Sequence, residues 1–356
     1  KAEETWPVHM FYNFNNRGTK FTNRARNGPG FSFTNFTGNA DILTALASYG
    51  ESGSFAAYSV GYSLPIEQTG TTINLDGNYV ASQILGDLQA LGVTGLAWGI
   101  NMEISQIFYQ DIGLTVEGLV GFEIQDSKTL QHNVKLSFDR MRVFKAGPRL
   151  TFRDANGRTF LEAKIKQGIP SFLAGSEDPD PSTSVPGSSG EFTFFTANVM
   201  RLQRLPWSSY LFVKADGQFT GDTLTSLEQY RQGGAFSVRG YPESDALGDY
   251  GENFSIELGV PVPIFPLDMS VPFIPKRKWG DAVHMDAFLD GGNVFINNRN
   301  TNEGAIKRKF LLGVGFGVRV DFDDTASLRF DYGFPVGNPS TDKNRPQVPI
   351  SITAGF

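Results

Sequence analysis

The chain of 356 residues contains no cysteine, and this absence excludes several kinds of protein. Without thiols there is no disulfide framework, no thiol chemistry and no cysteine-based zinc site. The sequence also lacks any run of about 18 apolar residues, the length that a membrane-spanning helix requires. Residues 1–6 hold no signal-peptide core, so we expect any signal to have been removed or the sequence to have been trimmed.

Positive charge and histidine are scarce as well. The net charge is −6, and nucleic-acid binding calls for a basic face, so no nucleic-acid partner is expected. The histidines His9, His132 and His284 are scattered, with no HExxH spacing and no Gly-x-Ser-x-Gly elbow. The sequence therefore predicts no enzyme and no cofactor. An outer-membrane lipase using His284 is the alternative, but a hydrogen-bonded lumenal histidine is favoured.

One acidic run, residues 177–181, has the oxygen ligands that calcium prefers. Its prolines and its lack of a glycine pivot favour a solvated loop instead. We therefore expect no metal site.

Glycine and aromatic residues are abundant, with 40 Gly, 31 Phe and 11 Tyr, and apolar residues recur at every second position. In residues 311–322 the even positions are apolar, whereas most odd positions are glycine or charged. A soluble β-sandwich also alternates in this way. Segments of about ten residues with a heavy aromatic load are typical of a barrel that is apolar outside and polar inside.

We predict an all-β fold, a transmembrane antiparallel β-barrel of 16 strands that occupies residues 1–356 as one domain. The predicted strands are 7–15, 30–39, 41–50, 54–65, 72–82, 95–107, 112–126, 138–154, 158–169, 191–204, 208–219, 252–261, 282–295, 309–322, 326–336 and 348–356.

Several strand positions that should face the lumen are charged, with both signs present. These are Glu117, Glu123, Glu162, Lys164, Lys166, Lys214 and Asp216. A dry protein core would not accept so many ionised groups without partners. The pattern therefore fits a water-filled pore or a packed plug.

The connections alternate between short turns and long loops, as in outer-membrane barrels. Residues 171–190 and 220–250 form the long loops. The connection 261–281 breaks the rule, because it is long where a short periplasmic turn is expected. Its Lys276, Arg277 and Lys278 leave two interpretations open. They contact lipid headgroups or a periplasmic partner in the first, and they belong to an ordinary solvated turn in the second, which is favoured.

Residues 227–258 carry the most distinctive pattern of the chain, a glycine pair, a Ser-Val-Arg-Gly-Tyr string, a Gly-Asp-x-Gly step and a glutamate. The matching residues are Gly233, Gly234, Ser237, Val238, Arg239, Gly240, Tyr241, Gly248, Asp249, Gly251 and Glu257. This block resembles the ShlB/FhaC/HecB-type transporters of two-partner secretion, within the Omp85 superfamily. Phe288, Asp290 and Gly292 match the Phe-x-Asp-x-Gly strand motif of that superfamily.

The resemblance implies that the long loop folds back into the barrel and that Arg239 at its tip pairs with Asp290 on the lumenal wall. Gly240, Tyr241 and Val238 would complete this loop latch. Phe288, Gly292, Asp286 and Glu257 would support it from the wall.

Gly313, Gly315 and Gly317 lie on the lumenal face of the following strand. They leave two interpretations open, clearance for the folded-in loop or curvature of the strand.

The function that the resemblance implies is a translocation pore in the bacterial outer membrane that exports a partner exoprotein. Family members also carry periplasmic POTRA modules, for which there is no room before the first strand near Pro7. We expect these modules to lie outside this sequence or to be lacking. The alternative is a POTRA-less Omp85 barrel that assembles other barrels, forms a passive pore or is a structural subunit. The expected partners are membrane lipid and an exoprotein or other envelope proteins. The terminal Phe356 implies one more partner, the barrel-assembly machinery during biogenesis.

Overall fold

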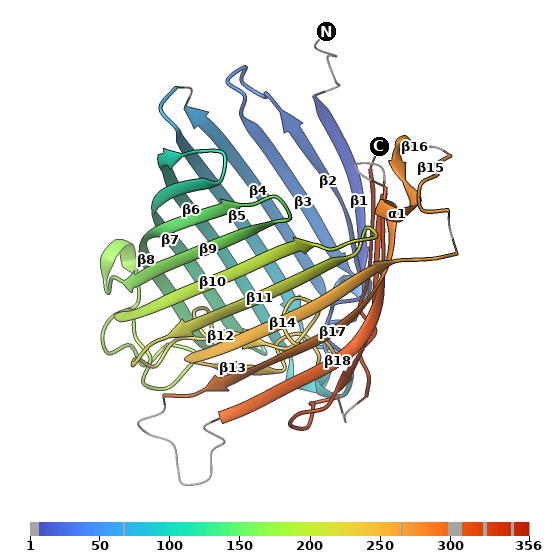
Figure 1. Cartoon of the computed structure of the whole chain (residues 1–356). Helices are drawn as coiled ribbons and strands as arrows, with labels where there is room; N and C mark the ends of the chain where they lie inside the picture. Colours follow the sequence, from blue (N-terminus) through green and yellow to red (C-terminus); the bar gives the residue numbers. More distant parts are fainter. Residues whose placement is uncertain are drawn as a thin grey trace.

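The computed structural model describes residues 7–66, 68–264, 266–272, 274–297, 308–322, 326–342 and 345–355. Sixteen strands close into one antiparallel barrel, in the order β1 to β11, β14, β17, β18, β19 and β20 (Figure 1). The prediction of an all-β barrel of 16 strands is confirmed. Among the described residues, no helix is long and apolar enough to span a membrane.

The bounds of the barrel strands are β1 Val8–Asn15, β2 Arg26–Thr34, β3 Ile42–Gly50, β4 Phe55–Ile66, β5 Thr71–Gln83, β6 Val93–Gln110, β7 Leu114–Gln131, β8 Val134–Arg153, β9 Gly157–Gly168, β10 Phe192–Arg204, β11 Tyr210–Phe219, β14 Tyr250–Pro261, β17 Val283–Phe295, β18 Arg308–Asp321, β19 Ala326–Pro335 and β20 Ile350–Gly355. The other elements are β12 Tyr230–Gln232, β13 Ala246–Gly248, β15 Ser270–Val271, β16 Ile274–Lys278, α1 Trp279–Ala282 and short 3-10 turns at Glu51–Gly53, Gly86–Leu91 and Phe172–Ala174.

The alternation of the sequence appears as two faces of the wall. On β14, Phe254, Ile256 and Leu258 point outward and are exposed, whereas Ser255 and Glu257 point inward and are buried. Successive side chains of a strand lie on opposite faces, so a strand in a closed barrel presents one row to each side. The outward rows are apolar and the inward rows are polar or small, as in barrels that sit in a bilayer.

One predicted strand, 30–39, is wrong at both ends, because β2 runs from Arg26 to Thr34. Asn35 and Ala40 have φ angles of 61° and 57°, and the Asp41 carboxylate accepts the backbone N–H of Thr37. This local hydrogen bonding turns the chain before it can extend further. The strand begins as early as Arg26 because Arg26 pairs with Gly50 of β3.

The long loop between β11 and β14, residues 220–249, lies inside the barrel (Figure 1). Its first part contributes Leu224 and Leu227 to an apolar cluster on β8 and β10. Its later part contributes Val238, Tyr241 and Ala246 to a second cluster with Val294 of β17 and Leu311 of β18. The loop is therefore packed against two separate parts of the lumenal wall.

The long connection between β14 and β17 contains the hairpin of β15 and β16 and the helical turn α1 (Figure 1). Two of its basic residues form ion pairs, Arg277 with Asp321 at 3.0 Å and Lys278 with Asp268 at 3.3 Å. The side chain of Lys276 lies outside the described residues, as does Phe356.

Candidate functional site: the arginine at the tip of the inward loop

The tip of the inward loop is shaped by the β12–β13 hairpin, which pairs Tyr230 with Gly248 and Gln232 with Ala246. At the tip, Gly240 has a φ of 100°, a conformation that side chains other than glycine rarely adopt. The Tyr241 hydroxyl donates to the Asn338 carbonyl at 2.9 Å, and Val238 beside the tip is fully buried. Arg239 is thereby held against the wall of β14, β17, β18 and β19.

Arg239 and Asp290 form a two-pronged ion pair. The Arg239 Nε donates to Asp290 Oδ2 at 2.7 Å, and Nη2 donates to Oδ1 at 2.9 Å. The backbone N–H of Arg239 also donates to Asp290 Oδ2, at 3.0 Å. A guanidinium matches a carboxylate in this bidentate way, and the charges strengthen both bonds.

The remaining donors of Arg239 meet other strands. Its Nη1 lies 2.5 Å from Glu257 Oε2 and 3.4 Å from Asp331 Oδ1, and Nη2 donates to the Ser255 hydroxyl at 3.2 Å. The guanidinium carbon lies 3.6 Å from the centre of the Phe288 ring, a cation–π contact. One side chain of the loop thus contacts β14, β17 and β19.

Arg239 is buried, which by itself lowers the pKa of a guanidinium. The hydrogen bonds and charge of Asp290, followed by the charges of Glu257 and Asp331, outweigh this and raise the pKa of Arg239 above its usual value. The loop tip therefore carries a permanent positive charge.

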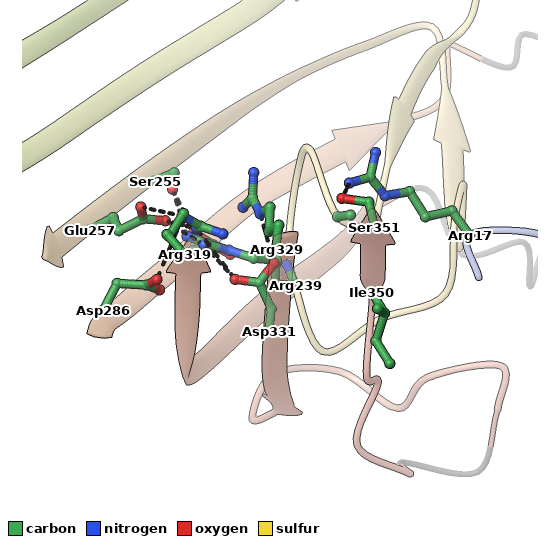
Figure 2. A network of polar contacts seen from close by, with 12 residues as sticks. Arg17, Arg239, Ser255, Glu257, Asp286, Arg319, Arg329, Asp331, Ile350 and Ser351 are labelled. Carbon is green, nitrogen blue, oxygen red and sulfur yellow. Dashed lines mark hydrogen bonds and ion pairs between the residues drawn. The ribbon is translucent and has the colours of Figure 1, made fainter. Parts of the chain in front are cut away.

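Two further arginines complete the network (Figure 2). Arg319 of β18 lies 2.7 Å from Glu257, 3.3 Å from Asp331 and 3.5 Å from Asp286. Arg329 of β19 lies 2.8 Å from Asp331. Arg319, Arg329, Asp331 and Ser255 were not among the predicted site residues, although strand alternation places them on the lumenal face.

Two of the expected wall residues lie apart from Arg239. The Asp286 carboxylate faces Arg319, and neither of its oxygens accepts a hydrogen bond among the described residues. Gly292 lies beside β12, where an added Cβ would be 2.0 Å from the Gln232 Nε2. Gly292 therefore gives room to the hairpin of the loop and not to its tip.

The lumenal glycines of β18 serve different neighbours. A Cβ on Gly313 would lie 1.8 Å from the Arg239 carbonyl oxygen, so this glycine admits the loop tip. A Cβ on Gly315 would lie 2.2 Å from the Tyr332 carbonyl oxygen and 2.4 Å from the Phe288 ring. One on Gly317 would lie 2.7 Å from the Phe330 carbonyl oxygen and 2.8 Å from the Asp286 and Asp331 carboxylates. Loop clearance thus applies to Gly313, whereas the other two glycines leave space for the backbone of β19 and for side chains of the network.

A second group of charges lines the opposite part of the wall, on β6 to β9. Arg149 approaches three carboxylates, with Glu162 at 2.8 Å and Glu103 and Glu117 at 3.4 Å. The group consists of Glu103, Glu117, Glu123, Glu162, Lys145, Arg149, Lys164 and Lys166. Its four acids and four bases balance.

The residues considered for catalysis or metal binding have other partners. His284 Nε2 lies 3.0 Å from the Ser208 carbonyl, and its ring packs edge-on against Tyr210. Asp180 of the acidic run accepts two hydrogen bonds from Ser182, from the backbone N–H at 2.9 Å and from the side-chain hydroxyl at 2.6 Å. Within the described part of the chain, no group of three or more acidic or histidine side chains could hold a metal ion.

A closed barrel of 16 antiparallel strands, with a long loop folded inside and its arginine on acidic residues of the wall, defines the class of the fold, a β-barrel of the outer-membrane type. Within that class, the chain belongs to the family described as haemolysin secretion/activation protein ShlB/FhaC/HecB, whose profile matches residues 1–320. The family is one of transporters.

Similar proteins agree with this placement. The heme/hemopexin transporter protein HuxB of Haemophilus influenzae is 20% identical over 362 residues, covering 100% of this chain and 61% of HuxB. The chain therefore spans about three-fifths of the length of the curated relatives it matches.

Solved structures share the fold. CdiB from Escherichia coli has a TM-score of 0.83 at 19% identity, covering 100% of this chain and 64% of CdiB. BamA from Haemophilus ducreyi lacking POTRA domains 1–3 has a TM-score of 0.65 at 13% identity, covering 99% of this chain and 71% of that structure. These likenesses establish the fold and no more.

Proposed function

We propose that the protein is a translocation pore of the bacterial outer membrane that exports a partner exoprotein. The observation that carries the proposal is the inward loop, residues 220–249, which occupies the lumen and is held there by Arg239. The family match and the transporter names of its relatives support the same assignment.

The lumen provides a polar path for an unfolded chain. Both signs of charge line it, and many of these charges form ion pairs on the wall, so a passing segment meets ion pairs and not a single strong field. No nucleotide is used in this mechanism, because the outer membrane has no ATP supply. Folding of the exoprotein outside the cell would drive its export.

Arg239, Gly240, Tyr241 and Val238 act as the latch of the loop on Asp290 in this proposal. Asp290 is fully buried, and removing the cation would leave its charge without its main partner. The loss of one partner from a buried ion pair costs on the order of 3–5 kcal/mol. The position of the loop tip against the wall then depends strongly on this side chain.

The Arg239→Ala variant tests the proposal. It should insert as a barrel but export far less exoprotein, because the loop loses its position. The measurement is the amount of exoprotein in the medium of cells that produce the full-length protein together with a candidate exoprotein. Arg231→Ala is the matched control, since Arg231 is an exposed arginine of the same loop that donates to the Ser226 carbonyl at 2.9 Å.

Export by Arg239→Ala at the level of Arg231→Ala would contradict the latch. Unchanged exoprotein secretion from cells lacking the protein would contradict the export function. If such cells lost other outer-membrane barrels instead, the protein would be assigned to barrel assembly.

A further inference from the structure

The connection between β14 and β17 packs on the outside of the barrel. We call its described residues, 262–264, 266–272 and 274–282, the rim flap. Val262, Val283 and Val320 form one outward row across β14, β17 and β18, since the Val262 N–H donates to the Val283 carbonyl and Val283 pairs with Val320. This row belongs to an apolar cluster with Val271, Ile274, Trp279 and Ala282 of the flap.

The covered row continues the bare outward face of the wall. In the preceding row, Val260 and Met285 are 42% and 47% exposed, whereas Val262 and Val283 are 8% and 7% exposed. Two residues along a tilted strand advance roughly 5 Å along the barrel axis. The headgroup layer occupies roughly the first 5–7 Å beyond the hydrocarbon core. A flap that lies one row beyond the lipid-facing Val260 and Met285 is therefore at the level of this layer.

The flap keeps large apolar side chains exposed beside charges. Ile264 is 84% exposed and Met269 is 54% exposed. The side chains of Lys278 and Asp268 are 55% and 99% exposed and pair at 3.3 Å. Trp279 packs edge-on against Phe322 with ring centres 6.3 Å apart. Exposed apolar groups next to charged groups and a tryptophan are the mixture found at membrane interfaces.

We propose that the rim flap binds the phospholipid headgroup layer on the periplasmic side, with Ile264 and Met269 inserted at the boundary of the acyl chains. The flap lies beside the wall at the end of the barrel where β1 begins (Figure 1). A bilayer surrounds the barrel at this perimeter, and the flap is continuous with the lipid-facing row of Val260 and Met285. The inference rests on the membrane location and orientation in the proposed function, but not on export.

The cysteine-free chain allows a direct test, because one introduced thiol labels one site. An environment-sensitive dye is attached to Ile264→Cys or Met269→Cys, and the full chain is reconstituted in vesicles of phosphatidylethanolamine and phosphatidylglycerol. Ile256→Cys, on the outward face of β14 and deeper in the wall, marks the hydrocarbon core. Glu177→Cys, an exposed acidic residue on a loop at the other end of the barrel, is the aqueous control.

Dyes at Ile264→Cys and Met269→Cys should emit at shorter wavelength than at Glu177→Cys. Nitroxides at the lipid headgroup should quench them more than nitroxides at mid-chain, with the reverse order at Ile256→Cys. Emission and quenching equal to those at Glu177→Cys would overturn the proposal. Shielding that appears only when a soluble periplasmic protein is added would overturn it too and assign the flap to a protein partner. No exoprotein is needed, so a failure of export leaves this result untouched.

Discussion

At the scale of single residues, the buried site contains more acidic than basic side chains. Four carboxylates face three guanidinium groups, and the seven residues are Glu257, Asp286, Asp290, Asp331, Arg239, Arg319 and Arg329. Without Arg239, four acids would share two arginines. Buried charges of one sign repel strongly where water is scarce. Arg239 is the only one of the three arginines that comes from the loop, so it couples the charge balance of the wall to the position of the loop.

Gly313→Ala tests how closely the loop tip must approach the wall. A Cβ at Gly313 would lie 1.8 Å from the backbone oxygen of Arg239. A backbone atom cannot avoid the clash by a change of rotamer, so the loop tip itself must shift. Overpacking of this kind costs about 1–3 kcal/mol, so the tip should move away from Asp290. The measurement is the distance between nitroxides at Leu247→Cys on the loop and Val134→Cys on β8, two exposed positions.

Gly77→Ala is the matched control, because a Cβ there meets nothing within 4 Å. A distance that shifts or broadens in Gly313→Ala and not in Gly77→Ala is the expected result. The same distance in both variants would show that the wall yields and the loop does not depend on this glycine.

At the scale of elements, the inward loop has a second attachment near its start. Glu228 is buried, and its carboxylate lies 3.8 Å from the Lys166 Nζ of β9, with one oxygen lacking a hydrogen-bond partner among the described residues. Burial raises the pKa of Glu228 above its usual 4.5, and the charge of Lys166 opposes this without cancelling it. The other charged groups that act on Glu228 are Glu123, Arg231 and Lys145.

The loop should therefore be less firmly held at high pH. A carboxyl group with a raised pKa in the folded state binds its proton more tightly there than in the unfolded chain, so it favours the folded loop most below pH 4.5. That stability is lost as the pH rises from 4.5 through the raised pKa. Glu228→Gln should remove the dependence and hold the loop better at neutral pH.

How firmly the loop is held can be measured with nitroxides at Leu247→Cys and Val134→Cys. The readout is the width of the distribution of distances between them, compared at about pH 5 and about pH 8. Glu191→Gln on the neighbouring loop is the control, because Glu191 is exposed. If the distance distribution of the wild type narrowed as the pH rises, the loop would be held more firmly at high pH, which is the opposite of the expected result.

Most of the elements could be predicted from the sequence, because strand alternation is a local property. The strand from Ile42 and the strand from Val283 begin within a residue of the predicted positions. The strand from Arg26 was misplaced, because its end is set by side-chain hydrogen bonds at Asp41 and its start by pairing with Gly50. Both depend on partners that alternation does not reveal.

At the scale of the whole molecule, the closed register decides which charges meet. Glu257 pairs with Phe288, which pairs with Gly315, and Asp286 pairs with Gly317, which pairs with Asp331. These rows place acids of three strands around the small residues of β18. The motifs indicated Arg239 and Asp290, but Arg319, Asp331 and Arg329 join them only through the register. The rim flap was likewise not predicted to cover the outside of the wall, because its apolar residues are not periodic.

The charge balance of the lumen yields a prediction for the whole pore. In the ion-paired group on β6 to β9 four acids face four bases, so this group is neutral. Arg149→Glu changes the balance to five acids and three bases, a net of −2, around a side chain that is 23% exposed to the lumen. An excess of one sign on a pore wall attracts the opposite ion.

The variant should therefore become cation-selective, seen as a shift of the reversal potential in planar bilayers under a potassium chloride gradient. Arg158→Glu changes the total charge equally, but Arg158 is exposed next to the turn between β8 and β9 and should leave the potential near that of the wild type. The shift should also shrink at high salt, because a Debye length of about 3 Å at 1 M screens the wall. Equal reversal potentials in the two variants would mean that ions do not pass along this part of the wall, and the lumen there would be a packed plug and not a path.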